Sequence, residues 1–188
     1  MSRRNRPLSA VCFTAALSTV ACGGAPSNGI DAAKSAMEAA RSVGAETYAI
    51  EAFTDAEKSL AEAVAEVEAQ GQRIVLFRSY TEASRLLREA KDRAEEARKQ
   101  AEIKRQEWKD EAETLIQQTQ AALVAARERV ENAHEAARRK KLTTALQQAS
   151  DLLFEAETLF KSGSYIEAHS KAEDAKTYAD EVAEESGS

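Results

Sequence analysis

The chain has 188 residues, a length that suits a single domain. Charged residues make up 31% of it, aromatic residues only 5%, and the formal net charge is −6 at pH 7. This acidic balance disfavours nucleic acid as a partner, because nucleic-acid phosphates would repel the protein. Alanine supplies about a fifth of the residues, a composition typical of long helices that pack through thin apolar faces.

The amino-terminal end has the pattern of an export signal. Arg3, Arg4 and Arg6 form a positively charged start. An apolar run then covers residues 8–21 and is broken only by small serine and threonine residues. The run is too short for a comfortable transmembrane helix and fits the apolar region of a secretory signal peptide. We therefore predict that residues 1–21 are a signal peptide.

A cysteine follows this run directly. Thr19, Val20 and Ala21 precede Cys22, and this segment resembles the lipobox of bacterial lipoproteins, although Thr19 stands where leucine is usual. The resemblance implies that Cys22 receives a diacylglycerol on its sulfur, becomes the new N-terminus and anchors the protein to a membrane through acyl chains. The alternative interpretation is an ordinary signal peptide with an incidental cysteine.

Cleavage before Cys22 would change the charge and the cysteine content. It would remove three arginines and no acidic residue, so the formal net charge would go from −6 to −9. It would also remove Cys12, and the single acylated thiol that remains could form no disulfide. The acidic charge disfavours an electrostatic grip on anionic lipids, so the acyl chains are expected to make the membrane attachment. By the lipoprotein resemblance, Gly23 favours the outer membrane, with the protein facing the periplasm.

Two helices are expected after a flexible tether. Residues 22–30 hold Pro26, the last proline of the chain, together with three glycines, and this composition predicts the tether. Apolar residues spaced three and four apart predict helices over residues 31–43 and 47–70. Gly44 follows the first of them, and glycine suits the left-handed position after a helix end.

The connection after the second helix is unusually apolar. It contains four consecutive large apolar residues, Ile74, Val75, Leu76 and Phe77. Folded over the end of a helical hairpin, they would belong to the core, and this is the interpretation that we favour. Exposed, they would form a partner site or an oligomer contact.

A third, very long helix is expected from Ser79 to about residue 140. Ser79 and Glu82 match the capping box, in which each side chain bonds the other residue's backbone N–H. Trp108 is the only tryptophan and is expected to pack on the first, second or fourth helix, whereas an exposed Trp108 would suggest an interface hot spot. The basic residues 138–141 are expected at the carboxyl end, where they would complement the helix dipole. The apolar stripe of this helix consists of Tyr80, Ala83, Leu87, Ala90, Ala94, Ala97, Ala101, Trp108, Ala112, Ile116, Thr119, Leu123, Ala126, Val130, Ala133 and Ala137.

The rest of the chain repeats the hairpin. A fourth helix is expected over residues 144–162 and a fifth over residues 164–184, with Gly163 between them. The Ser-Tyr-x-Glu-Ala sequence that begins the fifth helix also begins the long one, which indicates a repeated αα-hairpin. We therefore predict an elongated all-α fold of antiparallel helical hairpins, in two repeated units, around one long central helix. The expected parts are a hairpin with the long helix, residues 31–140, and a second hairpin with a frayed C-terminus, residues 141–188.

A family resemblance adds to this interpretation. The Ala-Glu-Thr-Tyr-Ala sequence at residues 45–49, the alanine-spaced helix and Arg78-Ser79-Tyr80 followed by Glu82-Ala83 resemble domain-of-unknown-function family 4398. Its members are alanine-rich, helical and frequently lipoproteins. The resemblance covers residues 31–105, with a weaker echo at 144–184, and it implies no catalytic residues. Many members carry Pro-Glu where Ile50-Glu51 stands here, which is a departure from the family pattern.

The sequence offers no pattern for catalysis. His134 and His169 are the only histidines, and neither has a cysteine or a second histidine at metal-ligand spacing. The chain also lacks the motifs of zinc proteases, serine hydrolases and phosphate-binding loops. We therefore expect no catalytic residue, no metal ion and no cofactor.

These features predict a lipid-anchored envelope lipoprotein that acts as a non-enzymatic scaffold or partner-binding module. Its expected partners are the membrane, through the N-terminal acyl chains, and an envelope protein or cell-wall component. One alternative is a coiled-coil-like homo-oligomer that serves as a periplasmic spacer. Another is a peptide-binding module similar to tetratricopeptide repeats, although their 34-residue spacing and closing proline are missing. The sequence leaves the oligomeric state open.

Overall fold

The structure, a computed structural model, describes residues 25–133 and 135–185. Every regular element in this part of the chain is a helix, so the predicted all-α class is confirmed. In chain order the elements are α1 (Ser27–Ser42), α2 (Ala45–Tyr48), α3 (Ile50–Gly71), the short 3₁₀ helix η1 (Val75–Phe77), α4 (Thr81–Glu131), α5 (Ala136–Ser162) and α6 (Tyr165–Glu185).

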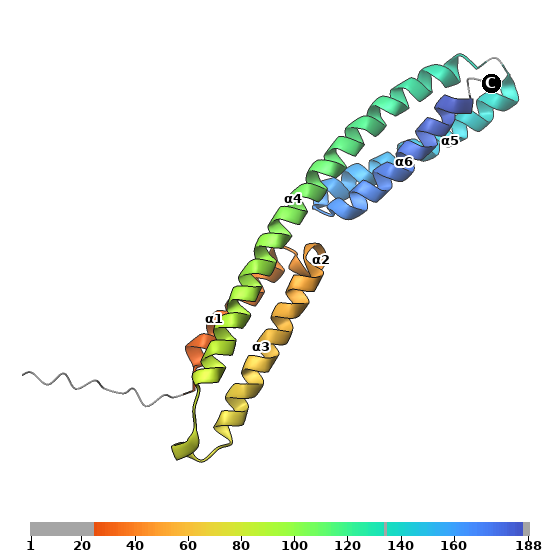
Figure 1. The fold of residues 1–188 in the computed structure, drawn as a ribbon. Helices are drawn as coiled ribbons and strands as arrows, with labels where there is room; N and C mark the ends of the chain where they lie inside the picture. Colours follow the sequence, from red (N-terminus) through yellow and green to blue (C-terminus); the bar gives the residue numbers. More distant parts are fainter. Residues whose placement is uncertain (1–24, 134, 186–188) are drawn as a thin grey trace, which may run out of the picture.

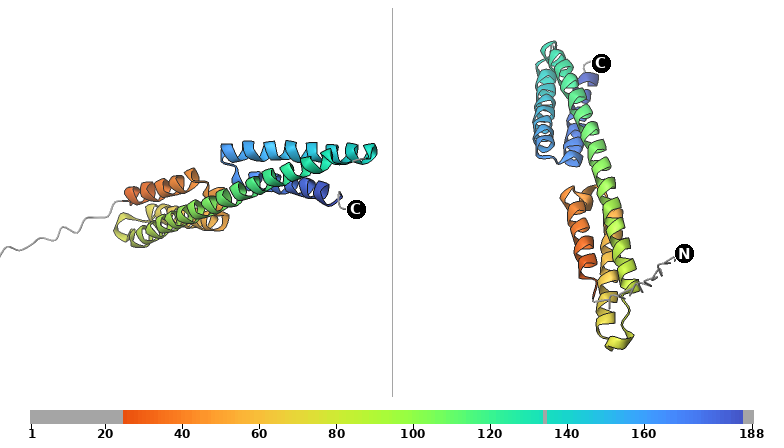
Figure 2. Two further views of the ribbon diagram at one scale, coloured as in Figure 1. Left: turned by 90° about the horizontal axis from the view of Figure 1, so that it is seen from above. Right: turned by 90° about the vertical axis from the view of Figure 1, so that its left-hand side faces the viewer.

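The helix α4 runs along the whole molecule. Its 51 residues span about 75 Å at 1.5 Å per residue. The first half of α4 packs against α1, α2 and α3, and the second half packs against α5 and α6 (Figure 1). Two further views show the same elongated arrangement, with one group of helices beside each half of α4 (Figure 2). The molecule is therefore a rod in which two groups of helices, α1–α3 and α5–α6, pack along one shared helix.

The core of this rod is thin and rich in alanine. In the first half, Met37 and Phe53 pack among fully buried alanines of α4, including Ala94 and Ala97. In the second half, Leu153 packs in a corresponding cluster of alanines from α5 and α6. Alanine loses no side-chain entropy and lets helix backbones approach closely, so local helix stability carries much of the fold. Every buried residue of α4 belongs to the apolar stripe that the sequence predicts, so the stripe is confirmed from Ala83 to Val130. Its predicted end is wrong, because Ala133 lies beyond α4 and Ala137 is an exposed residue of α5.

The first helices begin earlier than predicted. Helix α1 starts at Ser27, so it takes up the last four residues of the predicted tether. Gly44 has a φ of +87°, which confirms the left-handed position after the first helix. The predicted helix over residues 47–70 is divided at Ala49, whose extended φ of −143° separates α2 from α3.

The predicted capping box at the start of α4 is wrong. The helix begins at Thr81 and Tyr80 takes the cap position without a side-chain cap hydrogen bond. Glu82 instead accepts hydrogen bonds from Arg85 at 2.6 and 3.0 Å. The backbone N–H of Ser79 donates to the side chain of Gln70 at 3.0 Å, so the end of α3 holds the entry to α4.

The long helix also ends earlier than predicted. It stops at Glu131, and α5 begins at Ala136, so residues 138–141 lie in the first two turns of α5 and not at a helix carboxyl end. Arg139 uses its guanidinium to hold the connection, because its Nε donates to the carbonyl oxygen of Ala133 at 3.0 Å. The predicted boundary at residues 140–141 therefore falls inside a helix. The connection between α4 and α5 lies before that boundary, between Glu131 and Ala136.

The start of α1 lies close to the α3–α4 connection. A Cβ atom at Gly29 would lie 3.1 Å from Cδ1 of Leu87, which belongs to the second turn of α4. Helix α1 then runs parallel to α4, because Ala33 packs with Leu87 while Ala40 packs with Ala97 and Ala101, further along α4. In Figure 1 both the start of α1 and η1 occupy the lower end of the rod.

Candidate interaction surfaces

The α3–α4 connection places its apolar residues on the surface. Ile74, Val75, Leu76 and Phe77, which we call the tip loop, are 70, 72, 87 and 72% exposed. The prediction that they belong to the core is therefore wrong. The connection extends past the ends of α3 and α4 (Figure 1), and no other described element packs against η1. The alternative prediction of an exposed contact site stays open.

Hydrogen bonds hold the tip loop in a defined shape. The guanidinium of Arg78 donates from Nε to the carbonyl of Arg73 and from Nη2 to the carbonyl of Gly71, each at 2.9 Å. The 3₁₀ turn is closed by the N–H of Phe77, which donates to the carbonyl of Ile74 at 2.8 Å. Because these backbone groups are satisfied internally, the loop can present its apolar side chains outward without exposing a flexible backbone.

The surroundings of the tip loop are locally basic. Residues 69–81 contain two arginines, Arg73 and Arg78, and no acidic residue. Both arginines are exposed. This end therefore differs from the acidic chain as a whole, and it combines exposed apolar side chains with positive charge.

Trp108 lies on the middle of α4 and is half-buried. Its ring meets the ring of His169 on α6 edge to face, with centroids 5.4 Å apart and an interplanar angle of 78°. The prediction that Trp108 packs on the first, second or fourth helix is therefore wrong, because its partner belongs to the fifth predicted helix. His169 is thus engaged in an aromatic contact, and His134 lies outside the described residues.

The two halves of the rod meet beside the middle of α4. The hydroxyl of Tyr48 on α2 donates to the carbonyl of Gly163, in the α5–α6 turn, at 3.3 Å. The guanidinium of Arg105 lies 5.4 Å from the centre of the Tyr165 ring, a cation–π geometry. Sequence reasoning missed the contacts of Tyr48 and Arg105, because local patterns say nothing about contacts between residues that lie 115 and 60 positions apart.

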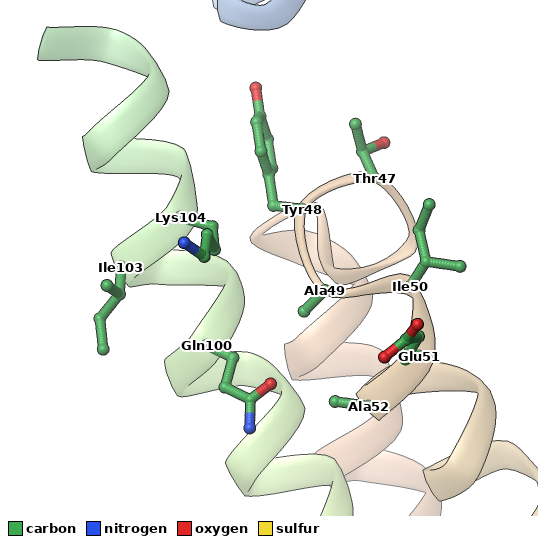
Figure 3. Close-up of a pocket in the computed structure, with 9 residues that line it drawn as sticks. All are labelled: Thr47, Tyr48, Ala49, Ile50, Glu51, Ala52, Gln100, Ile103 and Lys104. Atoms are coloured by element: carbon green, nitrogen blue, oxygen red, sulfur yellow. The ribbon is translucent and has the colours of Figure 1, made fainter. Parts of the chain in front are cut away.

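An open groove of about 440 Å³ lies beside this junction, between α2 and α4 (Figure 3). Glu51 lies at the start of α3, on the opposite side of the groove from α4 (Figure 3). Lys104 lines the groove from α4. The lining residues are Thr47, Tyr48, Ala49, Ile50, Glu51, Ala52, Gln100, Ile103 and Lys104.

The perturbed ionisable groups lie on the helix surfaces. Hydrogen bonds from Arg93 and Arg85 lower the pKa of Glu89, and a hydrogen bond from Arg85 lowers the pKa of Glu82. A hydrogen bond from Lys91 likewise lowers the pKa of Glu95. These groups lie on the solvent-facing side of α4, exposed or half-exposed, and are spaced three or four residues apart, so they support the helix and do not converge on a site.

The described residues offer neither a metal site nor a membrane span. Among residues 25–133 and 135–185, no group of three histidine, cysteine or acidic side chains could hold a metal ion. Within the same ranges, no helix combines the length and the apolarity that a membrane span requires. Cys22, the predicted lipidation site, lies outside the described residues.

Comparisons with known proteins identify no relative of this chain. No protein-family model, no curated protein and no solved structure matches it. The resemblances to bacterial lipoproteins and to domain-of-unknown-function family 4398 stay predictions that rest on the residues quoted for them.

Proposed function

We propose that this protein is a lipid-anchored lipoprotein of the bacterial cell envelope, held at the outer membrane and facing the periplasm. It acts as a non-enzymatic scaffold or partner-binding module, built as two repeated helical hairpins along one long helix. The observation that carries the proposal is the cysteine at position 22, which follows small residues and a positively charged, apolar leader.

The shape of the described chain supports an anchor at this position. Ala25, the first described residue, comes three residues after Cys22, and three residues span at most about 10 Å. The acyl chains would therefore enter the membrane close to the start of α1. From that end the rod extends by about the length of α4, roughly 75 Å at 1.5 Å per residue. Such a rod suits a protein that presents a surface at a distance from its membrane.

Fatty-acid labelling tests the anchor. Cells that make the protein are grown with a labelled fatty acid, and the wild type is compared with Cys22→Ala. Cys12→Ala is the matched control, because it removes the only other cysteine of the chain. We expect label and membrane fractionation in the wild type and in Cys12→Ala, and loss of both in Cys22→Ala. An unlabelled wild-type protein among the cytosolic proteins would end the proposal.

A partner search tests the scaffold role. The acylated protein is crosslinked in intact cells, and the envelope is then solubilised. We expect one envelope protein or cell-wall fragment to be recovered repeatedly with the wild type. Cells that yield only the uncrosslinked chain would argue against a binding module.

A homo-oligomeric spacer is the second candidate, favoured by one surface feature. Gln120 of α4 donates to Glu157 of α5 at 2.8 Å, so these antiparallel helices are aligned at that level. Val124 and Phe154 lie one turn from these residues, and they are 56 and 71% exposed. This apolar pair could join two copies through the second half of the rod. This candidate requires a mass in sedimentation well above the 20.4 kDa of one chain. Phe154→Ser should lower that mass toward the mass of a monomer. A wild-type protein that stays monomeric at high concentration would exclude the spacer.

A further inference from the structure

The tip loop concentrates the exposed apolar surface of this protein. Eight large apolar side chains are exposed among the described residues, and four of them are the consecutive residues of the tip loop. The remaining four form at most pairs, Val124 with Phe154 and Ile50 with Ile103, which both line the groove beside α2. Single exposed apolar residues are normal on a protein surface, whereas a contiguous patch indicates a surface that is covered in the working protein.

The position of the tip loop indicates what covers it. The start of α1 packs beside the second turn of α4, and the tip loop precedes the first turn of the same helix. Leu87 lies seven residues after Tyr80, a distance of about 10 Å along a helix. Cys22 lies within about 10 Å of Ala25 by chain length. An acyl chain on Cys22 would therefore enter the bilayer at the end of the rod that carries the tip loop.

The positive charge near the tip loop is also suited to a membrane surface. Arg73 and Arg78 stand immediately before and after the four apolar residues, with no acidic residue between positions 69 and 81. Apolar side chains bordered by basic ones are typical of segments that enter the interface of a membrane with anionic lipids. Leu76 and Phe77 are residue types typical of the apolar side of segments that lie in the membrane interface.

We propose that the tip loop is a second membrane contact, which enters the headgroup region of the bilayer that holds the acyl chains of Cys22. This inference rests on the proposed lipid anchor. One flexible anchor would leave the rod free to lie in any direction. Two contacts at the same end restrict its direction, because Arg78 bonds the end of α3 and Ser79, just before α4, bonds Gln70 of α3. The second half of the rod is thereby held away from the membrane, free to meet its partner.

Site-specific fluorescence in vesicles tests this contact. The acylated full-length mature protein carries Leu76→Cys, whose thiol is labelled with a polarity-sensitive fluorophore. Under the proposed function this thiol is the only reactive one, because Cys22 is acylated and Cys12 is removed. The protein is incorporated into vesicles of phosphatidylethanolamine and phosphatidylglycerol, with or without spin-labelled lipid. Phe154→Cys is the matched control, since Phe154 is comparably exposed but lies on α5.

We expect the fluorophore at position 76 to show blue-shifted emission and to be quenched by spin-labelled lipid. The fluorophore at position 154 should show water-like emission without quenching. The quenching should decrease when phosphatidylglycerol is omitted and when Arg73 is replaced by Glu. A second label at Ile74→Cys should lose its quenching when Leu76 and Phe77 are both changed to Asp. These residues are exposed, so the changes leave the fold intact.

Each opposite result has a distinct meaning. Vesicles that float with the protein while position 76 stays as unquenched as position 154 would overturn the membrane contact and leave the anchor standing. A label at position 76 that is shielded only in native envelope membranes would also overturn it, because the loop would then contact a protein. A protein that does not float with the vesicles would remove both the anchor and the inference.

Discussion

The alanine-rich core predicts a large cost for removing one of its few large side chains. Leu87 is 2% exposed and packs among Ala33, Ala63 and Ala90, which are fully buried. Replacing a buried leucine with alanine costs about 2–5 kcal/mol, and the cost is higher where the walls cannot close the space. The fully buried neighbours are alanines, whose methyl groups are too short to fill the space, and the larger Ile30, Leu60, Val67 and Leu86 pack only at its edge. We therefore expect Leu87→Ala to lower the free energy of unfolding by roughly 3 kcal/mol.

Urea unfolding followed by far-ultraviolet circular dichroism measures this cost. With a slope of about 2 kcal/mol per molar urea, a loss of roughly 3 kcal/mol moves the midpoint down by about 1.5 M. Leu76→Ala is the matched control, since it makes the same chemical change at a side chain that is 87% exposed. We expect it to change stability by less than about 0.5 kcal/mol. Equal effects of the two substitutions would refute the assignment of core and surface at this end of the rod.

Three further predictions concern the connections, a buried hydroxyl and acid stability. Gly163→Ala should cost about 1–2 kcal/mol in thermal unfolding, because residue 163 has a φ of +87°. Gly71→Ala is the control and should not destabilise the protein, because its Cβ would meet no atom within 4 Å and its φ is not left-handed. An equal loss of stability in Gly163→Ala and Gly71→Ala would contradict the argument from the positive φ of residue 163. Thr119→Val should cost about 0.5–1.5 kcal/mol in urea, because the single hydroxyl proton of this fully buried residue is shared between the carbonyls of Leu115 in α4, at 2.8 Å, and Ala172 in α6, at 3.1 Å. No loss would mean that this hydroxyl contributes nothing to stability. A hydrogen bond from Arg93 lowers the pKa of Glu89 from its ordinary 4.5, so its stabilising effect is complete above that pH and disappears as the pH falls through the lowered value. Glu89→Gln should therefore be less sensitive to acid in melts below pH 4.5, and an unchanged acid profile would exclude this pair as a cause.

The two proposals make the ends of the rod unequal. The end with α1 and the tip loop combines the expected acyl chains, four exposed apolar side chains and two arginines. The other half carries the α5–α6 hairpin and its exposed Val124 and Phe154. A membrane contact at the first end and a protein contact at the second would follow from this asymmetry.

Local sequence patterns were sufficient for the helices and their buried faces. The spacing of Ala83, Leu87, Ala90 and the later stripe residues predicts the face of α4 that is buried. This works because the 3.6-residue period of a helix depends only on neighbouring residues. Gly44 and Gly163 were likewise recognisable, because few other residues tolerate a positive φ.

The end of the long helix required the tertiary structure. Residues 131–141 contain no glycine or proline that would have indicated a turn. The chain nevertheless reverses after Glu131, and Leu142 of α5 then packs with Val130 and Val182. Burial of these side chains, which lie far apart in sequence, decides where α4 stops and α5 begins, and local helix propensity does not contain that information.

The sequence by itself determined that this protein is a set of alanine-faced helices behind an expected leader and anchor. Only the tertiary structure decided whether the apolar connection at residues 74–77 is covered and which helix meets Trp108. The tip loop is exposed because the connection passes beyond the ends of its helices, and Trp108 meets His169 because α6 folds back along α4. A run of apolar residues indicates that its burial would be favourable. Whether another element covers the run depends on how distant parts of the chain pack.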